Sequence, residues 1–169
     1  MLETDRFIAK LPTPEDIDNW TKLFTDPEVM QFIRKKTNTA AEVRAKYLDP
    51  SIKHAEKYGF SSCSIFAKDT GEFVGCVGIF HYGFDDTQPD IEIGYFLHKK
   101  YWGKGCAQEL AQGFIDWGFQ HLAISKLIAD ANPANERSWR VMEKLGMQYV
   151  GNILNPDKHE MLLYEIYKN

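Results

Sequence analysis

The stretch that most constrains the fold runs from Ile91 to Leu122. Its first seven residues, Ile91–Leu97, read as a strand and lead into a basic, glycine-containing turn. Directly after the turn, apolar residues from Ala107 to Leu122 recur at the three- and four-residue spacing of one helix face. The next expected strand follows at 125–131. Because a helix joins these two strands, we expect them to be parallel neighbours.

The turn between them has the features of an anion site. A helix leaves its first N–H groups without internal partners, and Ser, Thr, Asp or Asn usually satisfies one of them. No such residue stands between Lys99 and Gln108, while Gly103 and Gly105 allow the backbone to approach a ligand closely. Together with the lysines of the segment, the amides and the helix dipole predict a phosphate site. The alternative is a tight turn whose lysines serve only solubility.

Two standard phosphate motifs do not fit this turn. A P-loop requires Ser or Thr after Gly103-Lys104, where the chain has Gly105. The dinucleotide fingerprint requires a third glycine at the position of Gln108. The expected phosphate ligand is therefore of another kind.

Length, charge and cysteine content narrow the function classes. A chain of 169 residues is expected to form one domain spanning 1–169. A net charge of −4 argues against a nucleic-acid binder that works by bulk electrostatics. The three cysteines lack C-x-x-C spacing, which favours free thiols in a reducing compartment. Because Met1–Arg6 has no apolar signal segment and no run is long enough to span a bilayer, we expect a cytoplasmic protein without a membrane partner.

Periodicity and turn residues give the expected order of elements. Asp26–Phe32 is expected as a short helix, and 40–58 as a helical stretch interrupted at Asp49-Pro50. Asn135 or a close neighbour is expected to cap a helix that Gly146 ends. The order predicts a mixed sheet rather than a doubly wound parallel one. The expected strands are 6–11, 60–68, 73–80, 91–97, 125–131, 147–151 and 159–167, and the other expected helices begin at Thr13-Pro14 and at 106.

Several segments, in their order along the chain, resemble one known family: Leu2–Phe7, Thr13–Asp16, Glu92–Leu97, Tyr101–Ala107, Asn132–Ser138 and Met142–Met147. The chain is similar over nearly its full length to the GNAT superfamily of acetyl-CoA-dependent N-acetyltransferases. Within it, the likeness is greatest to the branch that includes ribosomal-protein alanine N-acetyltransferases. The resemblance implies an α/β (α+β) fold in one domain: a mixed, largely antiparallel sheet of about seven strands, helices on both faces and a splayed parallel pair in the middle.

The same resemblance implies a site for acetyl-CoA, that is, for coenzyme A bearing the acetyl group. Its pyrophosphate would lie on the backbone amides of 102–107, and its pantetheine arm between the strands at 91–97 and 125–131. A backbone N–H near the splay would polarise the thioester carbonyl. The implied cofactor-binding residues are Phe96, Leu97, Lys100, Trp102, Gly103, Lys104, Gly105, Cys106, Ala107, Asn135 and Ser138.

Two positions depart from the family pattern. Lys100 stands where many members have Gln or Arg, so the charge is kept but a planar donor is lost. Met142 stands where many members carry a tyrosine acid, and methionine has no proton to donate. If the enzyme is active, another residue or water must act as the acid.

Strand periodicity selects two candidate bases. A period of two places Glu92 and Phe96 on one face of their strand, and Asp130 and Asn132 on one face of the neighbouring strand. Either carboxylate is a candidate to take the proton of an attacking amine. The alternative is that either is an exposed strand charge or an ion-pair partner, and the sequence leaves this choice open.

Other side chains receive weaker assignments. Ser138 is a candidate to give a proton to the departing thiolate and Asn135 to bind pantetheine or water, although Asn135-x-x-Ser138 is also a helix-capping pattern. A nucleophilic role for Cys106 is disfavoured because no histidine stands nearby, and no metal is expected because the five histidines lack ligand spacing. The aromatic residues expected in the core or lining the amine pocket are Trp20, Phe24, Phe32 and Tyr47.

The resemblance implies an enzyme that moves acetyl from acetyl-CoA to a primary amine by direct attack in a ternary complex. The acceptor is either a protein or peptide N-terminus or a small-molecule amine, and the acidic net charge favours a cationic one. Alternatives are a non-catalytic acyl-CoA-binding module and an unrelated nucleotide-binding regulator. Both monomer and homodimer are compatible with the sequence.

Overall fold

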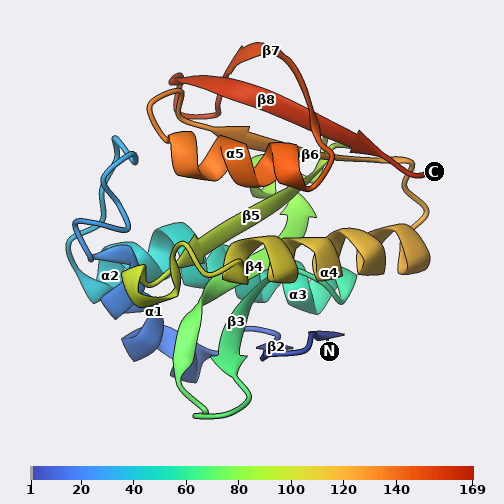
Figure 1. Cartoon of the computed structure of the whole chain (residues 1–169). Coiled ribbons are helices and arrows are strands. Elements are labelled where there is room, and N and C mark those ends of the chain that lie inside the picture. The colour runs from blue at the N-terminus through green and yellow to red at the C-terminus, as the bar shows by residue number, and fades with distance from the viewer. Residues whose placement is uncertain (1) are drawn as a thin grey trace.

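A single eight-stranded sheet forms the centre of the molecule. A computed structural model of the chain describes residues 2–169 and leaves Met1 outside the described part. The strand order is β1-β2-β3-β4-β5-β6-β8-β7, and every neighbouring pair is antiparallel except β5–β6 (Figure 1). The strands are β1 (Leu2–Glu3), β2 (Phe7–Lys10), β3 (Ser62–Ala67), β4 (Phe73–His81), β5 (Ile91–Leu97), β6 (Lys126–Ala131), β7 (Gln148–Leu154) and β8 (Glu160–Tyr167).

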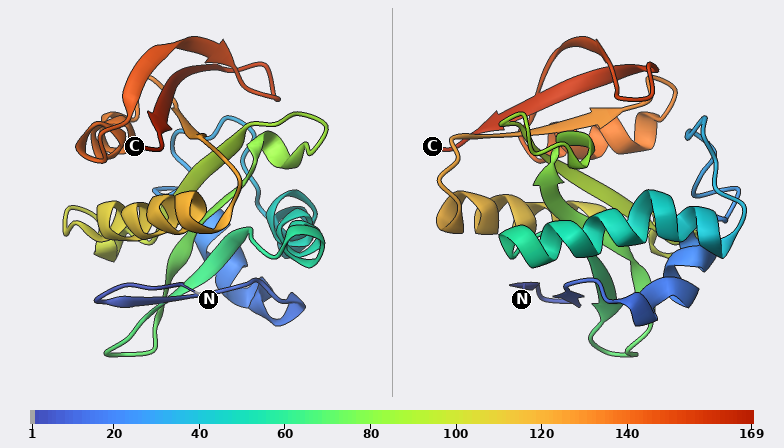
Figure 2. Two further views of the ribbon diagram at one scale, coloured as in Figure 1. Left: turned by 90° about the vertical axis from the view of Figure 1, so that its right-hand side faces the viewer. Right: turned by 180° about the vertical axis from the view of Figure 1, so that it is seen from behind.

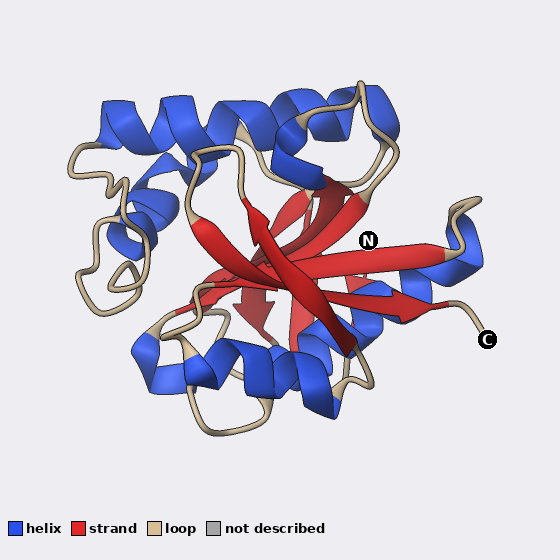
Figure 3. Ribbon diagram, turned by 90° about the horizontal axis from the view of Figure 1, so that it is seen from above, coloured by secondary structure: helices blue, strands red, loops and turns tan. Residues whose placement is uncertain are grey.

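Helices cover both faces of this sheet, as expected. The helices α4 and α5 lie on one side, and α1 to α3 lie on the other (Figures 2 and 3). Short 3-10 turns precede α1, follow β4 and lead into α4. The helical elements are η1 (Pro14–Asp16), α1 (Ile17–Phe24), α2 (Ala40–Val43), η2 (Arg44–Leu48), α3 (Asp49–Tyr58), η3 (Tyr82–Phe84), η4 (Lys99–Tyr101), α4 (Cys106–His121) and α5 (Glu136–Lys144).

The alternation of side chains along β5 divides the core into two layers. Ile93 and Leu97 point toward α4 and pack in a large apolar cluster with residues such as Leu110. Phe96, one position away, points to the other face and packs against a second cluster that contains Trp20 and Phe24 of α1. The period of two therefore places Glu92 and Gly94 on the α1 side of the sheet.

The parallel pair β5–β6 is splayed. β4 and β5 are paired along their length, from Gly75↔Leu97 to His81↔Ile91. Between β5 and β6, by contrast, the register consists of the pair Glu92↔Ile128. β6 is instead paired with β8 over its whole length. In the described part of the chain, the second half of β5 thus has no strand partner on its β6 side, as the resemblance implied.

Three expectations about local structure are wrong. Residues 27–32 form turns instead of a helix: the Asp26 carboxylate accepts the Glu28 N–H at 2.9 Å as an N-cap would, and the Met30 N–H donates to the Asp26 carbonyl, but the next bond, from Ile33 to Met30, already spans three residues. The helical stretch at 40–58 is not interrupted: α2, a π-helical turn and α3 follow without a break, and Pro50 lies in the first turn of α3. The sheet has one strand more than expected, because β1 pairs with Ile8 and Ala9.

Within 2–169, no helix combines the length and apolar character that crossing a membrane requires.

Candidate active site

The turn between β5 and α4 presents the start of a long helix without a side-chain cap. Gly105 occupies the cap position with φ +73°, and no side chain in residues 2–169 bonds to the helix start there. Gly103 also has a positive φ, and a Cβ added to it would meet nothing within 4 Å. The indole of Trp102 donates to the Leu97 carbonyl at 2.8 Å, and Arg6 donates to the Lys104 carbonyl at 3.0 Å. These bonds fix the loop. The Trp102 N–H donates to the Lys99 carbonyl at 3.0 Å, so the amides that remain for an anion begin at Gly103 and not, as expected, at Trp102.

The lysines of the turn are less involved than the sequence suggested. Lys100 forms an ion pair with Glu72 of the β3–β4 hairpin, and Lys99 forms one with Glu28. The cation that does lie over the turn is Arg137 of α5, whose guanidinium carbon is 4.1 Å from the centre of the Trp102 ring. Sequence analysis did not single out Arg137, because its position in α5 does not reveal which loop α5 faces.

A chain of adjoining cavities leads from this turn into the splay. A cavity of about 230 Å³ borders the turn and is lined by Trp102, Gly103 and Arg137, among others. A second, of about 100 Å³, shares Trp102 and Arg137 with the first and adds Phe96 and Ser138. A third, of about 130 Å³, shares Phe96 and Ser138 and lies between the parted strands. Cavities thus line the whole route, from the α4 turn to the splay, along which an extended ligand is expected to bind.

The start of α5 forms one wall of this path. Asn135 is the N-cap and its side chain accepts from the Ser138 N–H at 3.3 Å, which confirms the capping interpretation. The Ser138 hydroxyl donates to the Tyr95 hydroxyl at 3.1 Å, and Tyr95 donates to the Ser138 carbonyl at 2.9 Å. Burial raises the pKa of Tyr95 to about 12. Met142 is buried and lines the splay cavity together with Ser138 and Tyr95, whose hydroxyls can donate protons.

Tyr95 was not identified from the sequence. Strand parity places it on the face of β5 opposite to Glu92, and the search for acid and base groups followed the Glu92 face. Tyr95 borders the path nevertheless, because the parted strands open the sheet to both faces at this point.

Glu92 and Asp130 both line the splay cavity, one from each of the parted strands. Burial raises the pKa of Glu92 to about 8, and the charge of Asp130 adds to this effect. Burial also raises the pKa of Asp130, while a hydrogen bond from the Tyr82 hydroxyl, 2.8 Å from Oδ2, opposes the shift. No Lys or Arg of residues 2–169 pairs with either carboxylate within 4.0 Å. Neither is an exposed strand charge or an ion-pair partner.

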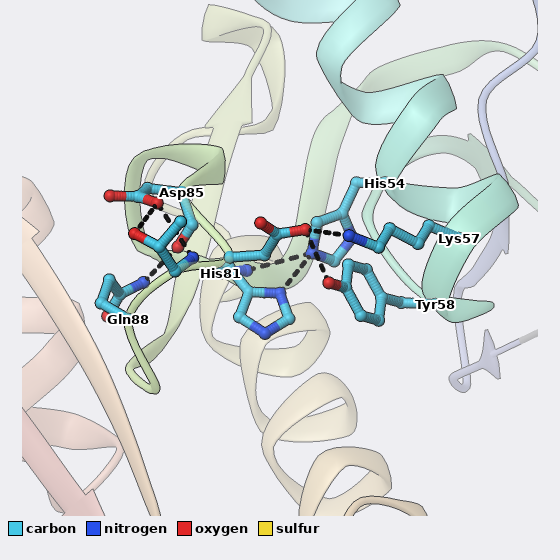
Figure 4. A network of polar contacts seen from close by, with 8 residues as sticks. His54, Lys57, Tyr58, His81, Asp85 and Gln88 are labelled. Carbon is cyan, nitrogen blue, oxygen red and sulfur yellow. Dashed lines mark hydrogen bonds and ion pairs between the residues drawn. The ribbon is translucent and has the colours of Figure 1, made fainter.

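Tyr82 is held beside Asp130 by a polar network at the end of β4. His54 Nε2 lies 2.8 Å from His81 Nδ1, which ties α3 to the last residue of β4 (Figure 4). Lys57 and Tyr58 of the same helix both donate to Asp86, in the loop after η3. This anchoring fixes η3, which also brings the Gly83 N–H to within 3.4 Å of Glu92 Oε2.

A larger cavity, of about 360 Å³, opens on the α1 side of the splay. Glu92 and Asp130 line it as well, so the carboxylates lie where the two cavities meet. Phe24 and Tyr47 stack with their ring centres 4.0 Å apart in its wall. All four aromatic residues named from the sequence line this cavity: Trp20, Phe24, Phe32 and Tyr47. Trp20 and Phe24 are also fully packed core residues, so both expected roles apply to them.

The thiol of Cys106 lacks the environment of a nucleophile. It is buried at the start of α4, and this burial raises its pKa despite the nearby Arg6. Across the described residues, no three His, Cys, Asp or Glu side chains group in a way that suits a metal ion.

Comparisons with known proteins bear on the family and on the fold. Residues 6–148 match the family model described as an acetyltransferase (GNAT) domain. The chain is 36% identical over 154 residues to the uncharacterized protein YkkB of Bacillus subtilis, covering 88% of this chain and 85% of YkkB. It is 30% identical to the uncharacterized N-acetyltransferase p20 of Bacillus licheniformis, covering 98% and 92% of the two chains. The fold is similar to that of aminoglycoside acetyltransferase AAC(6')-Ib solved in complex with coenzyme A, with a TM-score of 0.77 at 20% identity over 96% of this chain and 95% of that one.

Proposed function

The chain belongs to the GNAT acetyltransferase family, and on that premise we propose that it transfers the acetyl group of acetyl-CoA to a primary amine by direct attack in a ternary complex. The observation that carries the proposal is the place of Glu92 and Asp130. They stand where the path from the α4 turn meets the large cavity, so that a base is available at the point where two substrates arrive from opposite sides.

The path fits an extended, phosphorylated ligand such as coenzyme A. The uncapped amides of 103–107 and the cation Arg137 suit a pyrophosphate. The free edge of β5 at Phe96 and Leu97 suits the amide groups of a pantetheine arm, with Asn135 and Ser138 on the opposite wall. When bound, acetyl-CoA supplies the acetyl thioester whose carbonyl carbon accepts the amine. The exposed Lys104 is available to the phosphates, whereas Lys100 would first have to leave Glu72.

We assign the general base to Glu92. An amine is protonated at neutral pH, so a group must take its proton before attack, and such a group works best when its pKa is near the operating pH. The pKa of Glu92, about 8, meets this condition. Asp130, held by Tyr82, contributes the negative charge that helps to raise the pKa of Glu92. We treat Asp130 as a positioning residue for this reason.

We assign the acid to the hydroxyl pair of Ser138 and Tyr95. Ser138 lines the two inner cavities of the path; its hydroxyl donates to the Tyr95 hydroxyl, and Tyr95 in turn donates to the Ser138 carbonyl. Ser138 can give its proton toward the thiol side once its hydroxyl turns away from Tyr95, and the Tyr95 proton, which lies on the Ser138 carbonyl, can then turn to replace it. This arrangement offers a substitute for the tyrosine acid of many family members, at whose position this chain has Met142.

The likeness of Leu2–Phe7 to the N-terminus of ribosomal-protein N-acetyltransferases supports a further proposal, that the chain belongs to that branch of the family.

The test is release of coenzyme A thiol from acetyl-CoA in the presence of a panel of amines that includes N-terminal peptides, polyamines and small aromatic amines. We expect amine-dependent thiol release by the wild type and its loss in Glu92→Gln, with thermal stabilisation by coenzyme A kept in both. Stabilisation by coenzyme A without thiol release for any amine would instead identify a non-catalytic acyl-CoA-binding module. Stabilisation by ATP or NAD but not by coenzyme A would overturn the proposal.

A further inference from the structure

We propose that the acceptor amine carries an anionic group, a carboxylate or a phosphate, which binds Arg34 and Lys46 at the mouth of the large cavity. This inference rests on the proposed function, since it concerns the second substrate of the same site. It assigns a chemical class to that substrate: a small amine with an apolar body and a negative charge at the end remote from the amine.

The cavity has charges of opposite sign at its two ends. Glu92 and Asp130 stand at its inner end, on strands at the centre of the sheet. Arg34 and Lys35, both exposed, line it from the loop that follows α1, and Lys46 lines it from η2. The inner end therefore suits an ammonium group, and the outer end suits an anion.

The cations at the mouth outnumber their partners. Lys35 pairs with Asp157 at 3.3 Å, and Lys46 donates to the Lys35 carbonyl at 2.8 Å. In residues 2–169, no carboxylate lies within 4.0 Å of the charged groups of Arg34 or Lys46. Arg34, Lys35 and Lys46 carry three positive charges at the mouth, and Asp157 carries one negative charge, so the local net charge is +2. This is the opposite of the cationic acceptor that the net charge of −4 indicated.

The placement of Lys46 is structurally unusual. It lies in the π-helical turn Arg44–Leu48, together with Tyr47 of the cavity wall. Such turns interrupt the regular helical bonding and occur often at functional sites. Lys46 is half-buried, and burial lowers its pKa although Asp157 partly compensates. The Lys46 ammonium is half-buried and donates to a carbonyl, so an anionic ligand can stabilise its charge more than it would stabilise the charge of a solvated surface lysine.

Between the two ends, the walls are aromatic. Phe24 and Tyr47 stack on one another, and Phe80 stacks on Phe84 with ring centres 4.4 Å apart. All four line the cavity. Its volume of about 360 Å³ is near the lower end of the usual range for small-molecule sites, ~300–1,000 Å³. A small amphipathic amine fits these features, whereas a polycationic amine would place further ammonium groups beside Arg34 and Lys46.

The test compares two amines that differ in one group. Para-carboxyphenethylamine and para-carbamoylphenethylamine share the amine and the aromatic ring, and the first alone carries a negative charge. We expect the wild type to use the carboxylate with a kcat/KM about tenfold higher than that of the amide. Kanamycin, a polycation, is expected to be the poorest acceptor. A second pair, tyramine phosphate and tyramine, tests whether a phosphate can take the place of the carboxylate.

The variants Lys46→Met and Arg34→Gln remove the two cations, and each should bring the carboxylate and amide probes close to parity. The matched control is Lys36→Gln, which neutralises an exposed lysine of the same loop that does not line the cavity and should keep the preference. Unchanged thermal stabilisation by coenzyme A verifies that each variant is folded. A preference that survives in Lys46→Met and in Arg34→Gln would overturn the inference.

The result also separates this inference from the proposed function. Equal use of the two probes by the wild type, with thiol release intact, overturns the anion site and leaves acetyl transfer standing. If neither probe is acetylated, calorimetry of each probe with the protein and coenzyme A decides the question. Tighter binding of the carboxylate, lost in Lys46→Met, supports the anion site, and equal or absent binding overturns it.

Discussion

The Tyr82 hydroxyl donates a hydrogen bond to Asp130 Oδ2 at 2.8 Å. Tyr82 follows β4, whereas Asp130 lies on β6, and β5 separates these two strands in the sheet. The bond therefore reaches across the sheet at the place where β5 and β6 part. It gives the half-buried Asp130 carboxylate its donor and joins the anchored η3 turn to the place where the splay cavity meets the large cavity.

Replacing Tyr82 with phenylalanine should lower kcat about tenfold, while thermal stabilisation by coenzyme A stays the same. Without the donor, the pKa of Asp130 rises further, and the negative charge that helps to raise the pKa of Glu92 is weakened. The pH profile of kcat should therefore shift to lower pH. Tyr149→Phe removes an exposed hydroxyl that bonds to Asn152 on β7 and serves as the control. A Tyr82→Phe profile that matches the wild type would contradict a positioning role.

Glu92→Gln should reduce kcat/KM by about 10²–10⁴-fold, the usual contribution of a general base. The active form of Glu92 is the carboxylate, so wild-type activity should rise with pH up to about 8, where this group loses its proton. The variant should lose that rise. Glu160→Gln, on the exposed side of β8, should leave the profile unchanged. A wild-type profile that is flat between about pH 6 and about pH 9 would remove Glu92 from this role.

The same pKa predicts a stability effect that needs no substrate. The ordinary value for Glu is 4.5, and the folded protein holds the Glu92 proton up to about pH 8. Between these values the folded state binds more protons than the unfolded chain, so stability falls as the pH rises through this window. In thermal denaturation, the wild-type melting temperature should fall by several degrees more than that of Glu92→Gln between about pH 6 and about pH 9. Parallel curves for the two proteins would mean that Glu92 is not buried as a neutral acid.

Arg137→Ala should weaken coenzyme A binding about tenfold with little change in kcat. The guanidinium lies on the Trp102 ring beside the uncapped amides, where it can contact a phosphate. Calorimetry at low and high salt provides the measurement, since the loss should shrink as salt screens the charge. Arg44→Ala, an exposed arginine paired with Asp49, is the matched control. Equal affinity of Arg137→Ala and the wild type would exclude Arg137 from the site.

Gly78→Ala should be strongly destabilising, by more than about 3 kcal/mol in the free energy of unfolding. A Cβ at this position would lie 2.1 Å from the Ser61 carbonyl oxygen, so β3 and β4 would have to separate. Gly113→Ala is the comparison, because its Cβ would meet only the side chains of Thr4 and Leu2 and alanine favours a helix. Chemical denaturation should show a loss for the first variant and little change or a small gain for the second.

Local features of the site followed from the sequence. The uncapped start of α4 depends on the absence of a capping residue near Gly105, and the cap at Asn135 depends on Asn-x-x-Ser spacing. The common face of Glu92 and Phe96 depends on the period of a strand. Each of these is set by residues close together in the chain, so that neighbouring side chains and backbone geometry were enough to predict it.

Side-chain partners between distant segments were decided only by the tertiary structure. Lys100 is drawn to Glu72 because the β3–β4 hairpin lies beside the turn, and Arg137 reaches Trp102 because α5 packs next to α4. The pairing of Tyr82 with Asp130 and the gathering of Arg34 and Lys46 at one cavity have the same origin. Sheet order and helix packing bring such residues together across tens of positions. No local pattern encodes that proximity, so the sequence alone determined the elements and their faces, and the packed fold determined the charges that surround the substrates.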